Sequence, residues 1–322
     1  MMVILSWFGK RATGCLPAGV VLGLALPELA ASAKPLLVPA IALMLTLSLL
    51  RLDPTEVGRS LRRPRLLLPA VGFVLLASPL LGFAAARILD LSPGIAVALV
   101  VWSASPPLIS VPAIATLVGL DGALALTVTT VAGLLVPVTL PPIVFALLGL
   151  ELDIGPVALA VRLALLLAGS ALAAAAIRRF AGPARLRTHA DAIDGGFVIV
   201  MLLFAIAVMD GVTQAAVASP GRVAGLLALV FGVTLGMQVL GWAVFRPAGA
   251  RTATTLALAC GNRNMALVLG AAPAAFDPDT FLYLALLQFP IYLLPGLLRP
   301  IYRRAGGRGV AGQAWSASAD RR

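Results

Sequence analysis

Long apolar runs separated by short polar segments dominate this chain and limit what it can fold into. Hydrophobic residues make up 61% of the sequence and charged residues only 11%, too little charge to cover the surface of a soluble protein. A helix of about 20 apolar residues is long enough to cross the hydrocarbon core of a bilayer. Ten such runs are found, near residues 13–29, 35–52, 66–88, 93–118, 122–149, 155–179, 193–210, 220–245, 252–275 and 280–302. The sequence therefore predicts an all-α polytopic membrane protein.

The basic residues are distributed unevenly between the segments that connect these runs. With the N-terminus in the cytoplasm, the cytoplasmic segments carry Lys10, Arg11, Arg51, Arg59, Arg62, Arg63, Arg65, Arg178, Arg179, Arg185, Arg187, Arg246, Arg251 and the arginines from Arg299 to Arg322. The opposite side keeps Lys34, Arg87 and Arg222. This is the positive-inside bias that orients membrane proteins. The net charge of +11 is thus interpreted as topological, with no nucleic-acid partner, and both termini are expected in the cytoplasm.

Two terminal segments and the cysteines need separate interpretations. The first run, preceded by Lys10-Arg11 and followed by Ala31-Ser32-Ala33, also resembles a cleavable secretory signal, so its cleavage stays open as an alternative to a permanent first span. Cys15 and Cys260 both lie in spans, which implies no disulfide framework. The Gly-, Ser- and Arg-rich stretch 305–322 is expected to be a disordered cytoplasmic tail.

A weak internal repeat is visible when the chain is shifted by 158 positions. Asp121 then falls on Asp279, Pro137 on Pro295, Pro142 on Pro300 and Ile143 on Ile301. Five spans in each half mean that the second half enters the membrane from the opposite side, as in many secondary transporters. We therefore expect two inverted five-helix repeats, residues 1–150 and 151–304.

Two spans are interrupted at matching positions of these halves. Arg263 stands in the middle of the ninth run, within Cys260-Gly261-Asn262-Arg263-Asn264. An arginine at this depth costs roughly 2.5 to 3.5 kcal/mol and by default marks a functional site. The same shift places Arg263 on Ser105 in the fourth run, where Pro106, Pro107 and Pro112 interrupt the helix. Interrupted segments in corresponding positions are the best sequence indication of a transporter's binding site, with Pro106, Pro107, Pro112 and Gly261 as breaks or hinges.

The residue types at the two breaks favour an anionic ligand. Arg263 offers a permanent charge and a planar fork that matches a carboxylate, and half-helix N-termini also attract anions. The remaining polar candidates for substrate binding are Asn262, Asn264, Ser103, Ser105 and Ser110. Other interpretations stay open: Arg263 can form an ion pair with Asp194 or Asp210, the asparagines can join helices by hydrogen bonds, and the prolines can be simple kinks.

These motifs resemble the bile acid:sodium symporter family, whose relatives include arsenite exporters and auxin-type carriers. The resemblance rests on Ser105-Pro106-Pro107, on Asp121-Gly122-Ala123-Leu124-Ala125-Leu126-Thr127-Val128-Thr129-Thr130 and on Cys260-Gly261-Asn262-Arg263-Asn264, and it extends from about Thr13 to Arg304. It implies ten spans in two inverted repeats, with the fourth and ninth spans crossing as broken helices at the substrate site.

The sequence departs from this family where sodium would bind. The positions of the family's sodium-binding Ser and Asn in the fourth span are Val111 and Pro112, and in the ninth span Ala259 replaces a Glu and Arg263 replaces a Gln. Thr129 and Asn264 remain, and Thr129 is a possible cation ligand. A hard cation needs several oxygen ligands, so we expect Arg263 to stand in for the missing cation.

The expected function is therefore secondary transport of a small organic anion by alternating access. The substrate would bind where the broken spans meet, in a protein of the plasma membrane, by composition a bacterial inner membrane. A sodium-coupled symporter, an arsenite-type exporter and a channel or sensor with the same fold are the alternatives. His189, the single histidine, lies in a basic loop and no intramembrane carboxylate pair is evident, so an enzyme is not expected. No cofactor and no obligatory protein partner are implied, and sodium or proton coupling stays possible.

Overall fold

The computed structural model describes residues 12–51, 64–149 and 154–306, and these residues are helical throughout apart from short connections. The helices are α2 (Ala12–Ala25), α3 (Pro27–Ala33), α4 (Leu37–Arg51), α6 (Pro64–Gly72), α7 (Ser78–Ile88), α8 (Pro93–Ala104), α9 (Val111–Leu117), α10 (Gly122–Leu148), α11 (Pro156–Ala181), α12 (Pro183–Thr188), α13 (Ala190–Ala207), α14 (Val212–Ala218), α15 (Pro220–Phe245), α16 (Ala250–Gly261), α17 (Ala266–Ala271), α18 (Pro278–Leu286), α19 (Gln288–Leu297) and α20 (Arg299–Gly306). A π-helical turn (Phe73–Ala77) joins α6 to α7, and 3-10 turns adjoin α3, α15 and α17. Most of the predicted tail, 305–322, lies outside the described residues, but Ala305 and Gly306 still belong to α20.

Seven helical stretches are long and apolar enough to cross a membrane. They are Pro27–Leu50, Arg65–Ile88, Gly122–Leu148, Pro156–Ala181, Ala190–Ala218, Pro220–Ala248 and Pro278–Leu297. The other three predicted spans contain only shorter helices. In the spans expected at 93–118 and 252–275 the reason is the predicted interruption, which divides each into two helices. The protein is thus a multi-pass membrane protein with seven candidate spans in the described part of the chain.

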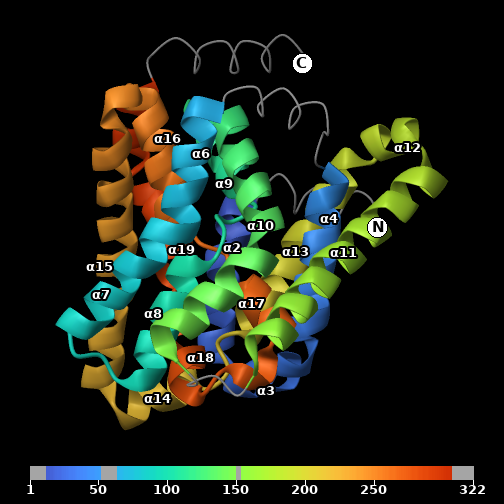
Figure 1. Ribbon diagram of the computed structural model, residues 1–322. Coiled ribbons are helices and arrows are strands. Elements are labelled where there is room, and N and C mark those ends of the chain that lie inside the picture. The colour runs from blue at the N-terminus through green and yellow to red at the C-terminus, as the bar shows by residue number, and fades with distance from the viewer. Residues whose placement is uncertain (1–11, 52–63, 150–153, 307–322) are drawn as a thin grey trace.

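The helices form two groups that lie side by side (Figure 1). In one group, α2, α3, α4, α11 and α13 pack together, and we call it the side layer. In the other, α6 to α10 pack with α15 to α19, and we call it the crossing bundle because it holds both interrupted spans. The two groups meet where α10 packs on α11 and where α17 packs on α4 and α11. Any site at the interruptions therefore borders the interface between the groups.

The first helix is packed into the side layer by two glycines. A Cβ atom on Gly19 would lie 2.9 Å from Leu202 Cδ1, and one on Gly23 would lie 2.7 Å from the carbonyl oxygen of Ile206. Small residues four positions apart allow membrane helices to approach closely, and Thr213 adds a 2.8 Å hydrogen bond from its hydroxyl to Leu24 O. α2 therefore packs closely on α13.

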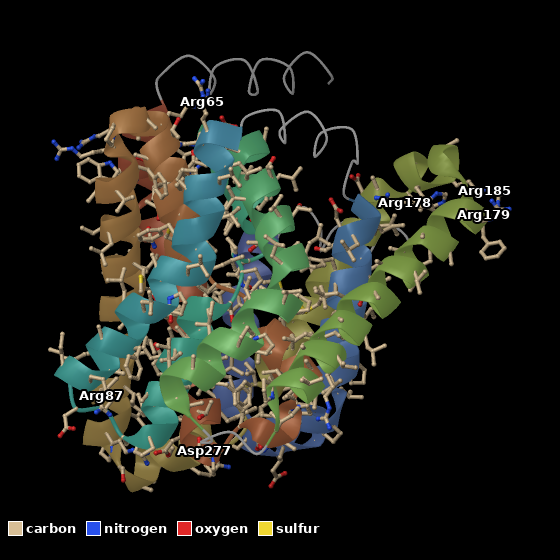
Figure 2. All side chains as sticks on the ribbon, viewed as in Figure 1. Arg65, Arg87, Arg178, Arg179, Arg185 and Asp277 are labelled. Carbon is tan, nitrogen blue, oxygen red and sulfur yellow. The ribbon has the colours of Figure 1, made fainter. Side chains whose placement is uncertain are left out.

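Charged side chains gather at the two ends of the helices. Arg65, Arg178, Arg179 and Arg185 lie at one end, and Arg87 and Asp277 lie at the other (Figure 2). The predicted basic end and the predicted sparsely charged end are thus separate in space. Five basic residues of the predicted cytoplasmic side lie outside the described residues: Lys10, Arg11, Arg59, Arg62 and Arg63.

The long helices that follow the two interruptions begin in the same way. Asp121 caps α10 by accepting a 3.0 Å hydrogen bond from Leu124 N, and Asp277 caps α18 by accepting a 2.6 Å bond from Thr280 N. The start of each long helix is also hydrogen-bonded to the interrupted span of the other half of the chain. Asp121 N, at the start of α10, donates to Thr255 Oγ1 of α16, and Thr280 Oγ1, at the start of α18, donates to Gly94 O of α8. Asp121 and Asp277, 156 positions apart, thus have the same capping role, whereas the shift of 158 positions pairs Asp121 with Asp279.

Candidate functional site

The two interrupted spans cross at their breaks and pair through their backbones. Leu108 N donates to Asn262 O and Asn264 N donates to Pro106 O, both at 2.8 Å, which makes Pro107 and Arg263 the partners of an antiparallel β-bridge. Proline has no N–H group, so α8 cannot continue through Pro106 and Pro107. Backbone groups at membrane depth must find partners within the protein. The crossing provides them for both breaks at once.

Arg263 fills the space beside this bridge and is 1% exposed. Its Nε donates to Cys260 O at 2.7 Å, and its Nη1 donates to Val74 O at 3.0 Å and to Ser105 O at 3.1 Å. Its Nη2 donates to Ser78 Oγ at 2.6 Å. These four oxygens, which we call the oxygen cage, come from three spans of the crossing bundle. The guanidinium therefore occupies a cation site made of neutral oxygens.

Each backbone carbonyl of the oxygen cage is available because a helix is interrupted there. The usual helical donor to Cys260 O would be Asn264 N, which bonds to Pro106 O instead. Ser105 follows the last residue of α8 and is extended, with ψ of 153°. Both carbonyls lie at the ends of half-helices, where unpaired C=O groups carry about half a negative charge. The guanidinium thus lies where the C-terminal ends of α8 and α16 converge.

The third carbonyl is released by the π-helical turn in the span from α6 to α7. Ser78 N bonds to Phe73 O, five residues back, rather than to Val74 O. The next residue, Pro79, has no N–H group to offer. Val74 O is therefore left for Arg263. Val74, Ser78 and Pro79 were not among the predicted site residues, although a Ser-Pro pair inside an apolar span is a visible sequence signal for a disturbed helix.

The environment of Arg263 corrects two expectations about its side chain. A guanidinium has five N–H groups, and the four bonds of the oxygen cage leave one on Nη2, so the expected two-pronged grip on a carboxylate is not available in this conformation. The alternative of an ion pair with Asp194 or Asp210 is not seen either: neither is among the hydrogen-bond partners of Arg263, and Asp210 pairs with Lys34 at 2.8 Å. Within the described part of the chain, the charge of Arg263 is not neutralised by any carboxylate.

The other predicted side chains are only partly brought together. Ser103 Oγ and Ser105 Oγ donate to carbonyls of their own helix, Val100 O and Val101 O, and both residues are fully buried. Asn262 Nδ2 likewise donates to Leu258 O at 2.8 Å, which leaves its Oδ1 without a partner. Ser110, at the start of α9, is partly exposed. The hydroxyls of Ser103 and Ser105 are thus engaged within α8, and Ser105 contributes its carbonyl oxygen to Arg263.

Asn264 and Arg263 line a small cavity between the crossing bundle and the side layer. Its volume is about 40 Å³, and its wall includes Met44 of α4, Met201 and Phe204 of α13, and Gln288 and Tyr292 of α19. A cavity of this size holds a few water molecules. The predicted site is therefore small in this conformation.

Gly261, Pro112 and Thr129 have individual roles in the geometry. A Cβ atom on Gly261 would lie 2.3 Å from Gln238 Cγ and 2.8 Å from Thr234 O, so only glycine lets α16 approach α15 at the break. Pro112 starts α9, where a missing N–H group costs nothing. Thr129, the possible cation ligand, is buried in α10, and its hydroxyl has no hydrogen-bond partner.

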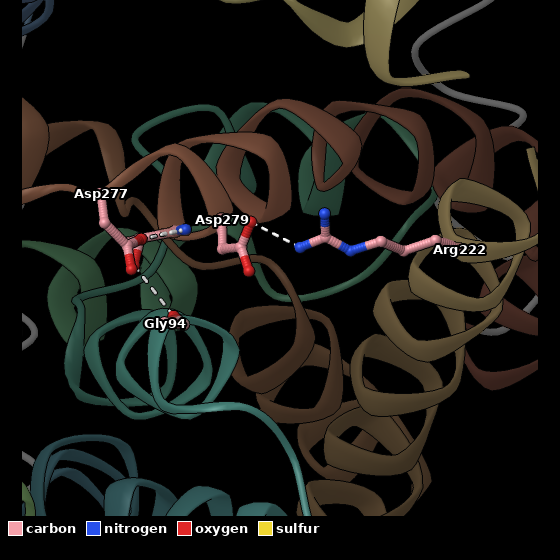
Figure 3. A network of polar contacts seen from close by, with 5 residues as sticks. Gly94, Arg222, Asp277 and Asp279 are labelled. Atoms are coloured by element: carbon pink, nitrogen blue, oxygen red, sulfur yellow. Dashed lines mark hydrogen bonds and ion pairs between the residues drawn. The ribbon is translucent and has the colours of Figure 1, made fainter. Parts of the chain in front are cut away.

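A larger cavity of about 540 Å³, which we call the vestibule, opens at the end of the molecule that holds Asp277. Four of its five charged side chains form two ion pairs, Lys34 with Asp210 at 2.8 Å and Arg222 with Asp279 at 2.5 Å. The second pair lies beside the hydrogen bonds that Thr280 donates to Asp277 and to Gly94 O (Figure 3). Lys34 Nζ also lies 5.0 Å from the ring centre of Phe281, which links the side layer to α18. No sequence motif indicates that these separate charges line one cavity.

Comparison with known protein families gives a match over part of the chain. Residues 38–178 match the sequence model of the Sodium Bile acid symporter family. The matched segment includes Val74, Ser78 and the first interruption, and it ends before Arg263. A search of the curated proteins gives no match. Residues 38–178 thus resemble the Sodium Bile acid symporter family, and this match supports the expectation that the chain is a membrane transporter and not an enzyme.

Proposed function

We propose that this transporter is a secondary carrier of an organic anion in which Arg263 takes the place of a coupling cation. The observation that carries the proposal is the oxygen cage, in which three backbone carbonyls and one hydroxyl surround the guanidinium. In transporters with discontinuous helices, unwound carbonyls and half-helix C-termini coordinate sodium ions. Here the same kind of ligand set is already used by a side chain, so a sodium ion and Arg263 compete for the same oxygens.

A fixed cation at the crossing also selects the sign of the substrate. The charge of Arg263 is buried and its partners are neutral oxygens. A buried charge without a counter-charge is costly, and a bound anion lowers that cost. The substrate is therefore negatively charged, and its binding does not require a sodium ion at this site. This also explains why the loss of the Glu at position 259 and the gain of Arg263 occur together.

Alternating access follows from the division into two groups of helices. The small cavity lies at their interface, with Met44 and Met201 in the side layer and Asn264 in the crossing bundle. Movement of the side layer against the crossing bundle would open this cavity to one end of the molecule and then to the other. The two repeats of five spans, 1–150 and 151–304, would supply the symmetry of this motion, with the basic end of Figure 2 facing the cytoplasm.

The experiment measures uptake of a labelled organic anion into proteoliposomes, with sodium or choline at fixed ionic strength. We expect saturable uptake in the wild type that sodium changes by less than about threefold. Arg263→Gln should lose at least about 90% of this uptake. The matched control, Arg162→Gln, removes an exposed arginine from α11 and should retain wild-type uptake.

A double variant, Ala259→Glu with Arg263→Gln, tests the exchange of cation directly. It restores a carboxylate and empties the oxygen cage, so its uptake should depend on sodium. Sodium stimulation of the wild type by more than about tenfold would contradict the proposal and support ordinary sodium symport. Uptake that does not saturate with substrate would support a channel.

A further inference from the structure

The residues that line the small cavity beside Arg263 indicate which kind of substrate can bind there. The cavity borders the interruption of the ninth span, α19 and the two side-layer helices α4 and α13. Apolar side chains form most of this wall, and its uncharged polar groups are Asn264, Gln288 and Tyr292. Gln288 is partly occupied by a bond from its Nε2 to Leu284 O. The cavity therefore offers few hydrogen bonds to a ligand, and apolar contacts dominate.

Methionines are concentrated at this cavity. The chain has seven methionines, and three of them, Met44, Met201 and Met265, line it from three different helical segments. The methionine side chain is unbranched and polarizable, so it adapts to ligands of different shape. Met44 and Met201 lie in the side layer whereas Met265 lies in the crossing bundle, so movement between the two groups would enlarge the cavity without removing its apolar character.

The charges in the wall limit the number of anionic groups that the ligand can carry. Arg263 is the charged residue among those that line the cavity, and no carboxylate lines it. One anionic group of the ligand therefore balances the one uncompensated charge. A second anionic group would be buried among methionine, leucine and phenylalanine side chains without a counter-charge, which is strongly unfavourable.

We propose that this cavity binds monocarboxylates with a compact apolar body, branched or aromatic, and discriminates against dicarboxylates. The carboxylate lies toward Arg263 and Asn264, and the apolar body lies among Met44, Met201 and Met265. This inference rests on the proposed function and names the substrate class of the same site.

Three six-carbon ligands test the inference on the wild-type protein in detergent. They are 4-methylpentanoate, its uncharged amide 4-methylpentanamide, and the dicarboxylate adipate. Binding is measured by isothermal titration and by the shift of the thermal unfolding midpoint. We expect 4-methylpentanoate to bind at least about tenfold more tightly than either of the others. Equal or tighter binding of adipate, or equal binding of the amide, would overturn the inference.

Variants of the cavity wall separate a specific role from a general loss of stability. Met44→Ala enlarges the cavity and should shift preference from phenylacetate toward the larger 1-naphthylacetate by about fivefold or more. Met237→Ala removes a methionine of α15 that is more buried than Met44 and does not line the cavity, and its preference should stay that of the wild type. If Met44→Ala does not fold, Met44→Leu replaces it, and its stiffer side chain should narrow the range of accepted acids. An unchanged range in a folded Met44 variant would overturn the inference.

The outcomes also distinguish this inference from the proposed function. If no carboxylate binds or is transported, both fail. A second outcome is that adipate or another hydrophilic acid binds in an Arg263-dependent manner while 4-methylpentanoate does not bind. In that case the proposal of an anion carrier is supported, and the inference of an apolar monocarboxylate substrate is wrong.

Discussion

Arg263 Nη1 donates a 3.1 Å hydrogen bond to the carbonyl oxygen of Ser105, across the crossing of the two interrupted spans. The two residues belong to different halves of the chain, 158 positions apart. The same nitrogen also reaches Val74 O, so one guanidinium group joins the third, fourth and ninth predicted spans. The side chain that carries the charge is thus also a structural connection, and a substitution there should affect both stability and transport.

Replacement of Arg263 by lysine should lower stability although it keeps the charge. Lysine has a compact ammonium with three donors, whereas the oxygen cage is matched to a planar group that makes four bonds. Loss of one bond to a charged group costs about 1.5 to 3 kcal/mol. The thermal unfolding midpoint of Arg263→Lys is measured in detergent and compared with that of Arg162→Lys, a control that changes an exposed residue of α11. A midpoint equal to that of the wild type would show that the cage does not depend on the guanidinium shape.

Ser78→Ala should be more destabilising than a comparable change at Ser103. The Ser78 hydroxyl accepts the 2.6 Å bond from Arg263 Nη2, so its loss costs about 1.5 to 3 kcal/mol. The Ser103 hydroxyl only donates to Val100 O of its own helix, and loss of this hydrogen bond costs about 1 kcal/mol or less. Both serines are fully buried, which makes the comparison fair. Equal losses in the two unfolding curves would remove Ser78 from the oxygen cage.

The interruptions themselves were predictable from sequence, but the oxygen cage was not. Pro106, Pro107 and Pro112 in one apolar run and a central arginine in another indicate broken spans, because proline removes helix donors and a charge is costly in lipid. The spatial partners of Arg263 are mostly backbone carbonyls, and a carbonyl has no sequence signature. The prediction therefore assigned the guanidinium to a ligand carboxylate, with Asp194 or Asp210 as the alternative, whereas local breaks in three helices supply its acceptors.

The register between the halves shows another limit of sequence reasoning. A shift chosen from matching prolines aligned Asp121 with Asp279, whereas the residue that caps α18 is Asp277 and Asp279 pairs with Arg222. The bridge between Pro107 and Arg263 has the same offset of 156 as the two caps. Two acids separated by one residue cannot be distinguished by type alone, and only the hydrogen bond identifies the cap.

Gly261→Ala should disrupt the packing at the ninth-span interruption. The new methyl group would overlap the side chain of Gln238 and approach Thr234 O, both on α15. Overpacking of this kind costs about 1 to 3 kcal/mol, and the displaced break should also reduce transport. Gly232→Ala, on the open face of the same α15, should leave stability unchanged or raise it by about 0.4 to 1 kcal/mol. Equal thermal midpoints for the two variants would show that the close approach at Gly261 is not required.

Asp277→Ala should weaken the start of α18. Its carboxylate accepts from Thr280 N, and loss of an N-cap costs about 0.5 to 2 kcal/mol, whereas asparagine caps nearly as well. We therefore expect Asp277→Asn to recover most of the thermal midpoint that Asp277→Ala loses. The same pair of substitutions at Asp121 should behave alike, because that residue caps α10 in the same way. A failure of asparagine to rescue either position would assign the effect to charge rather than to capping.

The most direct test of the fixed-cation account is the affinity of purified protein for 4-methylpentanoate, measured by isothermal titration in sodium chloride and in choline chloride. The account predicts the same dissociation constant in both salts within about twofold, loss of binding in Arg263→Gln, and retained binding in Arg162→Gln. An affinity that rises more than about tenfold in sodium and survives in Arg263→Gln would contradict it, because the cation would then be sodium and Arg263 would serve structure alone.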